Sequence, residues 1–128
     1  ASDVYKRQHD MTPLRNWWKE DPEKTQRYYN HVLQRIGEAP DECTAEIVAQ
    51  IISNHLKTRS MLTIIPLQDW FAMDDSIKRK DIESERINVP ANSTHYWRYR
   101  MHITLEQLLQ ADNLNNKIVS LIKEAGRK

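Results

Sequence analysis

The 128-residue sequence has little of several features that would assign it to a simple class of protein. Its two glycines are few for a compact domain with many tight turns. Its single cysteine, Cys43, excludes an internal disulfide and a cysteine-rich zinc site and fits the reducing cytosol, so we expect a cytoplasmic protein. No apolar run approaches the roughly 20 residues of a membrane span, and no signal-peptide core is present, so we expect no membrane partner.

Neither sign of charge is in clear excess. The 19 basic and 18 acidic residues give a formal net charge of +1. Proteins that follow a phosphate backbone usually have a basic excess or a clustered basic face, and the sequence shows neither. We therefore expect no nucleic-acid partner.

The first eight residues differ from the rest of the chain, because they have neither hydrophobic periodicity nor a helix cap. Residues 3–8 (DVYKRQ) match the translation of a common transposon sequencing adaptor. We interpret residues 1–8 as a non-native, adaptor-like segment and expect the protein's own sequence to run over residues 9–128. The alternative is a natural disordered start.

Hydrophobic spacing and capping residues predict a mainly helical chain. Asp21 is a typical N-cap followed by a proline at the first helical position, and Thr104 with Gln107 forms a capping box. We expect helices over residues 11–18, 22–36, 44–56 and 104–111, and a last helix that Asp112 caps and that ends at Gly126.

One segment predicts a β-strand. Residues 61–66, from Met61 to Pro66, form an apolar and β-branched run that ends at proline, as in a strand buried on both faces of a parallel sheet. A single strand cannot satisfy its own backbone N–H and C=O groups. We therefore interpret the chain as a piece of a larger α/β protein whose other strands lie outside it.

Several polar and aromatic residues could serve a binding or catalytic site. His9 and Asp10 together can hold sugar hydroxyls, stabilise developing positive charge or ligate a metal; alternatively, Asp10 only caps the first helix. Gln68 and Asp69 follow the predicted strand, where active sites of barrels lie, although Asp69 could equally cap a short helix. Asn88 suits either a turn or a sugar hydroxyl.

Aromatic residues leave similar alternatives open. Trp17 and Trp18 suit a core more than a ligand platform. Residues 96–100 (YWRYR) alternate bulky and basic side chains, which would suit base stacking or a packed segment with ion pairs.

Four segments, in this order and spacing, carry a family resemblance. They are residues 9–18 (HDMTPLRNWW), 65–69 (IPLQD), 86–92 (RINVPAN) and 95–100 (HYWRYR). Together they resemble the C-terminal part of the 4-α-glucanotransferases, the family of amylomaltase and disproportionating enzyme. The resemblance covers the chain from His9 to its end.

This resemblance implies a (β/α)8 TIM barrel and a retaining mechanism with three carboxylates. Asp10 matches the third carboxylate, the transition-state stabiliser, and His9 matches its sugar-binding neighbour. Asn88 matches an asparagine that contacts glucose on the donor side. Gln68 and Asp69 match the motif after the eighth strand and are expected to orient groups in the substrate site. The nucleophile and the acid/base would lie on earlier strands, outside this chain.

We therefore predict the C-terminal fragment of a TIM barrel, from the end of strand 7 through helix 8, mostly helical with one buried strand. The parent enzyme would transfer segments of α-1,4-glucan between maltodextrins without a metal or organic cofactor. The fragment would be inactive alone and would need the missing N-terminal half of the same barrel as its partner.

A second hypothesis belongs to another class of protein. The chain would then be a small helical module that binds a protein or a single-stranded nucleic acid through residues 96–100 and its basic C-terminus.

Overall fold

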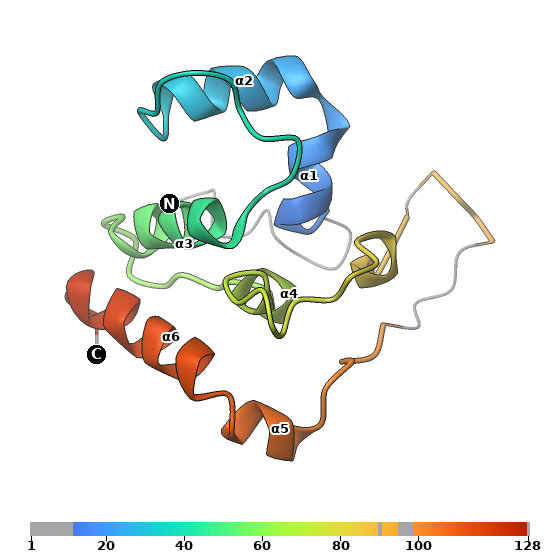
Figure 1. Cartoon of the computed structure of the whole chain (residues 1–128), viewed down its shortest axis with the longest axis vertical. Coiled ribbons are helices and arrows are strands. Elements are labelled where there is room, and N and C mark those ends of the chain that lie inside the picture. Colours follow the sequence, from blue (N-terminus) through green and yellow to red (C-terminus); the bar gives the residue numbers. More distant parts are fainter. Residues whose placement is uncertain (1–11, 90, 95–98, 128) are drawn as a thin grey trace.

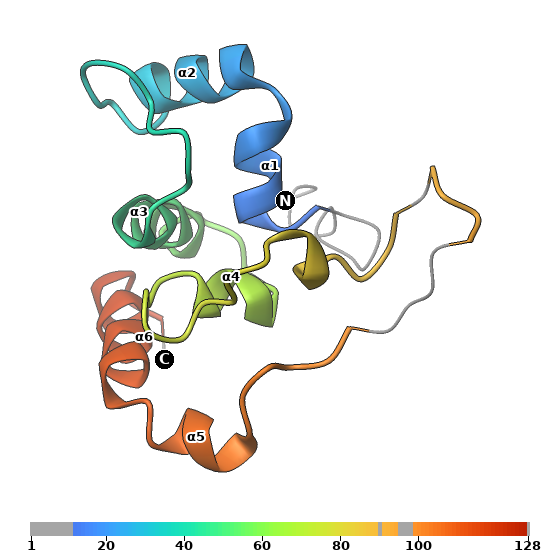
Figure 2. The same cartoon turned by 45° about the vertical axis from the view of Figure 1, so that its right-hand side comes forward.

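The computed structural model describes residues 12–89, 91–94 and 99–127, and within these ranges it contains helices and connecting segments but no strand. Helix α6 runs beside α3, and α1 and α2 lie on the other side of α3 (Figures 1 and 2). The elements in chain order are α1 (Leu14–Glu20), α2 (Pro22–His31), α3 (Ala45–Leu56), α4 (Leu67–Phe71), the 3₁₀ helix η2 (Glu83–Glu85), α5 (Leu105–Leu109) and α6 (Asp112–Glu124).

Most of the predicted helix starts are confirmed, because the capping side chains bond the backbone as expected. The Asp21 carboxylate accepts two N–H groups of the first turn of α2, and the Thr44 hydroxyl accepts one from α3. Thr104 forms the predicted capping box of α5. The start of α6 differs, since its N-cap is Ala111 and Asp112 lies within the first turn.

Helix α2 ends earlier than its hydrophobic spacing predicts. It stops at His31 and not at residue 36, and Val32 and Ile36 are 51% and 98% exposed. Gln34 takes a left-handed conformation with φ of 54°, which breaks the helical path. Leu33 turns into the core in place of the two exposed side chains.

The predicted buried strand is wrong for this structure. Residues 61–66 have no regular secondary structure, and Met61, Leu62 and Ile64 are 100%, 59% and 57% exposed. Only Ile65 of this run packs against the hydrophobic core. A strand needs neighbours for its backbone hydrogen bonds, and no segment of the described residues pairs with this one.

The hydrophobic core lies where α1, α3, α4 and α6 meet. Trp18 is 1% exposed and its indole N–H donates to the carbonyl of Pro40 at 2.8 Å, so this tryptophan serves the core and not a ligand platform. Trp17 is half-buried and packs edge-on against Tyr28. The buried apolar residues are Leu14, Trp18, Tyr29, Leu33, Cys43, Ile47, Val48, Ile51, Ile52, Leu56, Phe71, Ala72, Met73 and Leu114.

Candidate functional site

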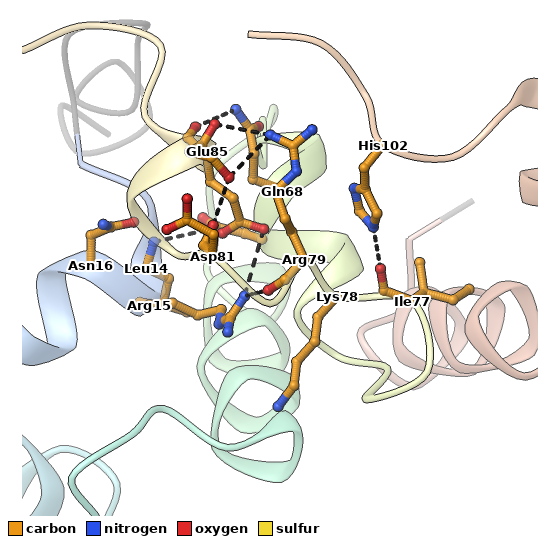
Figure 3. Close-up of polar contacts among 12 residues, drawn as sticks. Leu14, Arg15, Asn16, Gln68, Ile77, Lys78, Arg79, Asp81, Glu85 and His102 are labelled. Carbon is orange, nitrogen blue, oxygen red and sulfur yellow. Dashed lines mark hydrogen bonds and ion pairs between the residues drawn. The ribbon is translucent and has the colours of Figure 1, made fainter.

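Three segments singled out in the sequence meet around the first turn of α1. These are the start of α1, which follows His9 and Asp10 in the chain; α4, which carries Gln68 and Asp69; and η2, which precedes Asn88. Figure 3 shows the polar side chains of these segments pointing toward one another. His9 and Asp10 themselves lie outside the described residues.

The carboxylate of Asp69 caps α1 from a distance of 55 residues in the chain. Its Oδ1 accepts the backbone N–H of Leu14 at 2.9 Å. The local N-cap of α1 is Pro13, which offers no capping side chain. The first N–H groups of a helix have no partner within the helix, so Asp69 supplies from α4 what the local sequence lacks. Asp69 lies inside the first turn of α4 and is not the cap of a following helix, which was the alternative to a role in the substrate site.

An ion pair joins α1 to η2 in the interior. The guanidinium of Arg15 lies 3.6 Å from Oε1 of Glu85, and the two side chains are only 7% and 2% exposed. The same guanidinium donates to the backbone carbonyl of Arg79 at 2.6 Å. Gln68 adds a long hydrogen bond from its amide to the carbonyl of Glu85 at 3.4 Å. These contacts connect all three segments through one buried cluster.

Two further contacts tie α1 to η2 nearer the surface. Glu20 Oε1 accepts both the hydroxyl of Thr12 and the guanidinium of Arg86, each at 3.0 Å. The amide of Asn16 donates to Glu83 at 3.0 Å. The chain just after His9–Asp10 is thus held by the chain just before Asn88.

The electrostatics of this cluster centre on Glu85. Burial raises the pKa of its carboxyl from the ordinary value of 4.5 to about 7. The positive charge of Arg15 opposes this rise, the carboxylate of Asp69 adds to it, and the charge and backbone hydrogen bond of Arg79 lower the pKa again. Oε2 of Glu85 has no hydrogen-bond partner in the described residues, which fits a carboxyl group that is costly to ionise.

The structure places the predicted site residues in different surroundings. Gln68 and Asp69 are 5% and 1% exposed, so their polar atoms face the protein and not the solvent. Asn88 is half-buried in the segment that leads away from η2. The roles in sugar binding and catalysis that the resemblance implies for these residues stay predictions.

Sequence reasoning missed Arg15, Arg79 and Glu85. Glu85 ends the highly charged run of residues 74–85. No local signal distinguishes the two buried acids of this run, Asp74 and Glu85, from their exposed neighbours, because burial depends on how the segment lies against the rest of the fold. Arg15 carries a weak signal, since it stands between the buried Leu14 and Trp18 on a short helix.

The described residues give little support to a metal site, a membrane-spanning helix or the binding-module hypothesis. They contain no group of three or more histidines, cysteines or acids that could hold a metal ion. None of their helices combines the length with the apolar composition needed to cross a membrane. For the binding-module hypothesis, residues 96–98 lie outside the described residues and Tyr99 lies beneath the guanidinium of Arg79. Arg127 donates to three backbone carbonyls at the end of α3 and in the segment after it.

The sequence matches a protein family described as 4-alpha-glucanotransferase over residues 2–106. Because the match begins within the segment that we interpret as non-native, that interpretation stays a prediction.

Curated relatives carry the same name. One is "4-alpha-glucanotransferase DPE2" of Oryza sativa subsp. japonica, 39% identical over 93% of this chain and 13% of that protein. Two others are the 4-alpha-glucanotransferases of Chlamydia trachomatis and Chlamydia caviae, 29% and 27% identical, over 88% and 91% of this chain and 21% and 22% of those proteins. The chain thus spans about a fifth or less of the length of these relatives. No solved structure matches it significantly.

Proposed function

The chain belongs to the 4-alpha-glucanotransferase family, glycoside hydrolase family 77, and from this membership we propose that it is the C-terminal part of an enzyme that transfers α-1,4-glucan segments between maltodextrins. The family is one of TIM barrels. The observation that carries the proposal is the family match over residues 2–106, which contains all four motif segments completely. The structure supports it by bringing the neighbours of three of these segments into one cluster.

The proposed reaction is a retaining double displacement. One carboxylate attacks the anomeric carbon while an acid protonates the departing O4, and the resulting glycosyl ester is then attacked by the 4-hydroxyl of the acceptor as the same acid, now a base, takes its proton. These two groups stand about 5–5.5 Å apart in retaining enzymes and would come from the rest of the protein.

This chain would supply the surroundings of the oxocarbenium-like transition state. The carboxylate of Asp10 would stabilise the positive charge that develops on the sugar ring, and His9 would hold adjacent hydroxyls. Asn88 would bind glucose on the donor side through its amide. We propose no metal and no organic cofactor for the reaction.

The isolated chain should be inactive, since a stabilising carboxylate cannot replace a nucleophile. The exposed apolar side chains of residues 61–67 support the need for a partner, because Met61, Leu62 and Ile64 face solvent in the chain by itself. In the complete protein we expect them to pack against the missing part of the barrel.

The test uses the full-length protein that contains this segment, with maltotriose as substrate and the chain lengths of the products as the readout. We expect glucose and longer maltodextrins from the full-length protein and none from the 128-residue chain alone. Asp10→Asn should lower kcat by about 10²–10³-fold, the usual effect of removing one transition-state stabiliser. The control is Asp41→Asn, the same chemical change at an exposed acid.

Two results would contradict the proposal. If the full-length protein fails to transfer glucosyl units from any α-1,4-glucan, the proposed function is wrong. If kcat is unchanged in Asp10→Asn, Asp10 is not one of the catalytic carboxylates.

A further inference from the structure

We propose that the cleft between α3, α6 and the turn after α4 binds a neutral sugar, which it holds through the free carboxylate oxygen of Asp74 and the polar face of α6. This cleft is separate from the cluster around the start of α1. The inference does not rest on the proposed reaction, because the class of ligand follows from the groups that line the cleft.

The cleft has a volume of about 480 Å³, which is within the usual range of small-molecule sites. Helix α6 runs along α3, and the turn after α4 reaches α6 (Figure 2), where the ammonium of Lys117 donates to the carbonyl of Met73 at 3.0 Å. Elements far apart in the sequence therefore form its walls. The polar residues that line it are Asp74, Asn113, Asn116, Lys117 and Ser120.

The carboxylate of Asp74 distinguishes this cleft from a helix face that is only solvated. Asp74 is 8% exposed, and its Oδ1 accepts both the backbone N–H of Ser76 at 2.9 Å and the Ser76 hydroxyl at 2.6 Å. Its Oδ2 accepts no hydrogen bond within the described residues and is not shut off from solvent, so it opens into the cleft. A charged oxygen that local bonds hold in place is a strong acceptor for a ligand hydroxyl.

Helix α6 adds donors and acceptors at helical spacing. Asn113, Asn116 and Ser120 stand at positions i, i+3 and i+7, so they share the face of α6 that lines the cleft. In the part of the chain that the structure describes, their side chains have no hydrogen-bond partner. Amides and hydroxyls both donate and accept, so this face can match several hydroxyl groups at once.

The charges and the apolar floor of the cleft select the class of ligand. Among the described residues that line it, Asp74 is the only acid and Lys117 the only base, so neither an anion nor a cation is favoured. Ala49 and Leu121 supply apolar surface. This combination suits a sugar ring, which has C–H groups on its faces and hydroxyls at its rim. A second hollow of about 340 Å³ shares Asp74 and Asn113 with the first and leaves room for a second ring.

The experiment uses the full-length protein that contains this chain, with maltose as the neutral sugar and with glycine and inorganic phosphate as a zwitterion and an anion. Amide hydrogen exchange over residues 72–76 and 113–121 reports the cleft, and its dependence on maltose concentration gives a local Kd. We expect maltose to slow exchange in both segments with a Kd of about 1–10 mM, as suits a few hydrogen bonds to a neutral ligand. Glycine and phosphate should leave exchange unchanged at the same concentrations.

Two variants test the groups that the proposal names. Asp74→Asn keeps an oxygen for Ser76 and turns the free acceptor into an N–H donor, so the local Kd should rise at least about tenfold. Asn116→Ala removes one exposed amide and should raise the Kd about 2–10-fold without lowering the unfolding temperature. The control is Asn54→Ala, the same change at an exposed position of α3 that does not line the cleft, and its Kd should equal that of the wild type.

The proposal is overturned if roughly 100 mM maltose, far above a millimolar Kd, leaves exchange in these segments unchanged. Equal protection by glycine or phosphate overturns it as well. An unchanged Kd in a folded Asp74→Asn has the same meaning. If Asp74→Asn does not fold, Asn116→Ala decides: a raised Kd supports the site and an unchanged Kd overturns it.

Failure of the proposed function gives a different result. The wild-type protein would then transfer no glucosyl units from maltotriose, whereas maltose would still slow exchange over residues 72–76 and 113–121. Normal transfer without this local protection would leave the proposed function intact and overturn the sugar site.

Discussion

Glu85→Gln should change how the stability of the chain depends on pH. The Glu85 side chain is 2% exposed, and burial raises its pKa to about 7 from the ordinary value of 4.5. Between these two values the unfolded chain releases the proton while the folded chain keeps it. The folded state therefore loses stability as the pH rises through this window, which is the reverse of the usual effect of a salt-bridged acid.

The size of the effect follows from the difference in pKa. A rise from 4.5 to about 7 corresponds to about 3 kcal/mol of unfolding free energy, lost over roughly pH 4 to 8. Gln is neutral and nearly isosteric with protonated Glu, so wild type and Glu85→Gln should differ least at low pH. The variant should gain about 3 kcal/mol on the wild type by about pH 8.

The assay is urea unfolding of both proteins at several pH values, with the difference in unfolding free energy plotted against pH. All other titrating groups are common to the two chains and cancel to first order. The control is Glu42→Gln, the same chemical change at an exposed carboxylate 3.4 Å from Lys19, which should change the unfolding free energy by at most about 1 kcal/mol. A flat difference for Glu85→Gln would show that Glu85 ionises normally and would refute the reasoning.

Two further predictions concern the core and the helix caps. Ile51→Ala should lower the unfolding free energy by about 2–5 kcal/mol because it leaves a cavity among buried neighbours, whereas Ile64→Ala, at a 57% exposed position, should change it by less than about 0.5 kcal/mol in the isolated chain. Equal losses in urea unfolding would show that residues 61–66 are packed after all. Thr44→Ala should lower the unfolding free energy by about 1 kcal/mol, because the Thr44 hydroxyl accepts the N–H of Ile47. Thermal unfolding measures this loss, and a variant that unfolds at the same temperature as the wild type would show that water replaces the cap.

The candidate site shows what sequence spacing can and cannot predict. The motif order predicts that the segments of Asp10, Asp69 and Asn88 belong to one site, and the structure brings the neighbours of all three around the start of α1. The motif order does not predict the contacts that join these segments. The Arg15–Glu85 pair connects residues 70 positions apart, and nothing in the charged run of residues 74–85 marks Glu85 as a buried residue.

The sequence by itself determined the family, the helical character and most helix starts. It could do so because a cap such as Asp21 or Thr44 bonds groups only two or three residues away. Only the tertiary structure decided where α2 ends, that residues 61–66 form no strand, and that Glu85 is buried. The physical reason is that hydrophobic burial and strand pairing depend on which neighbours are present, and a local pattern cannot state which neighbours a segment will have.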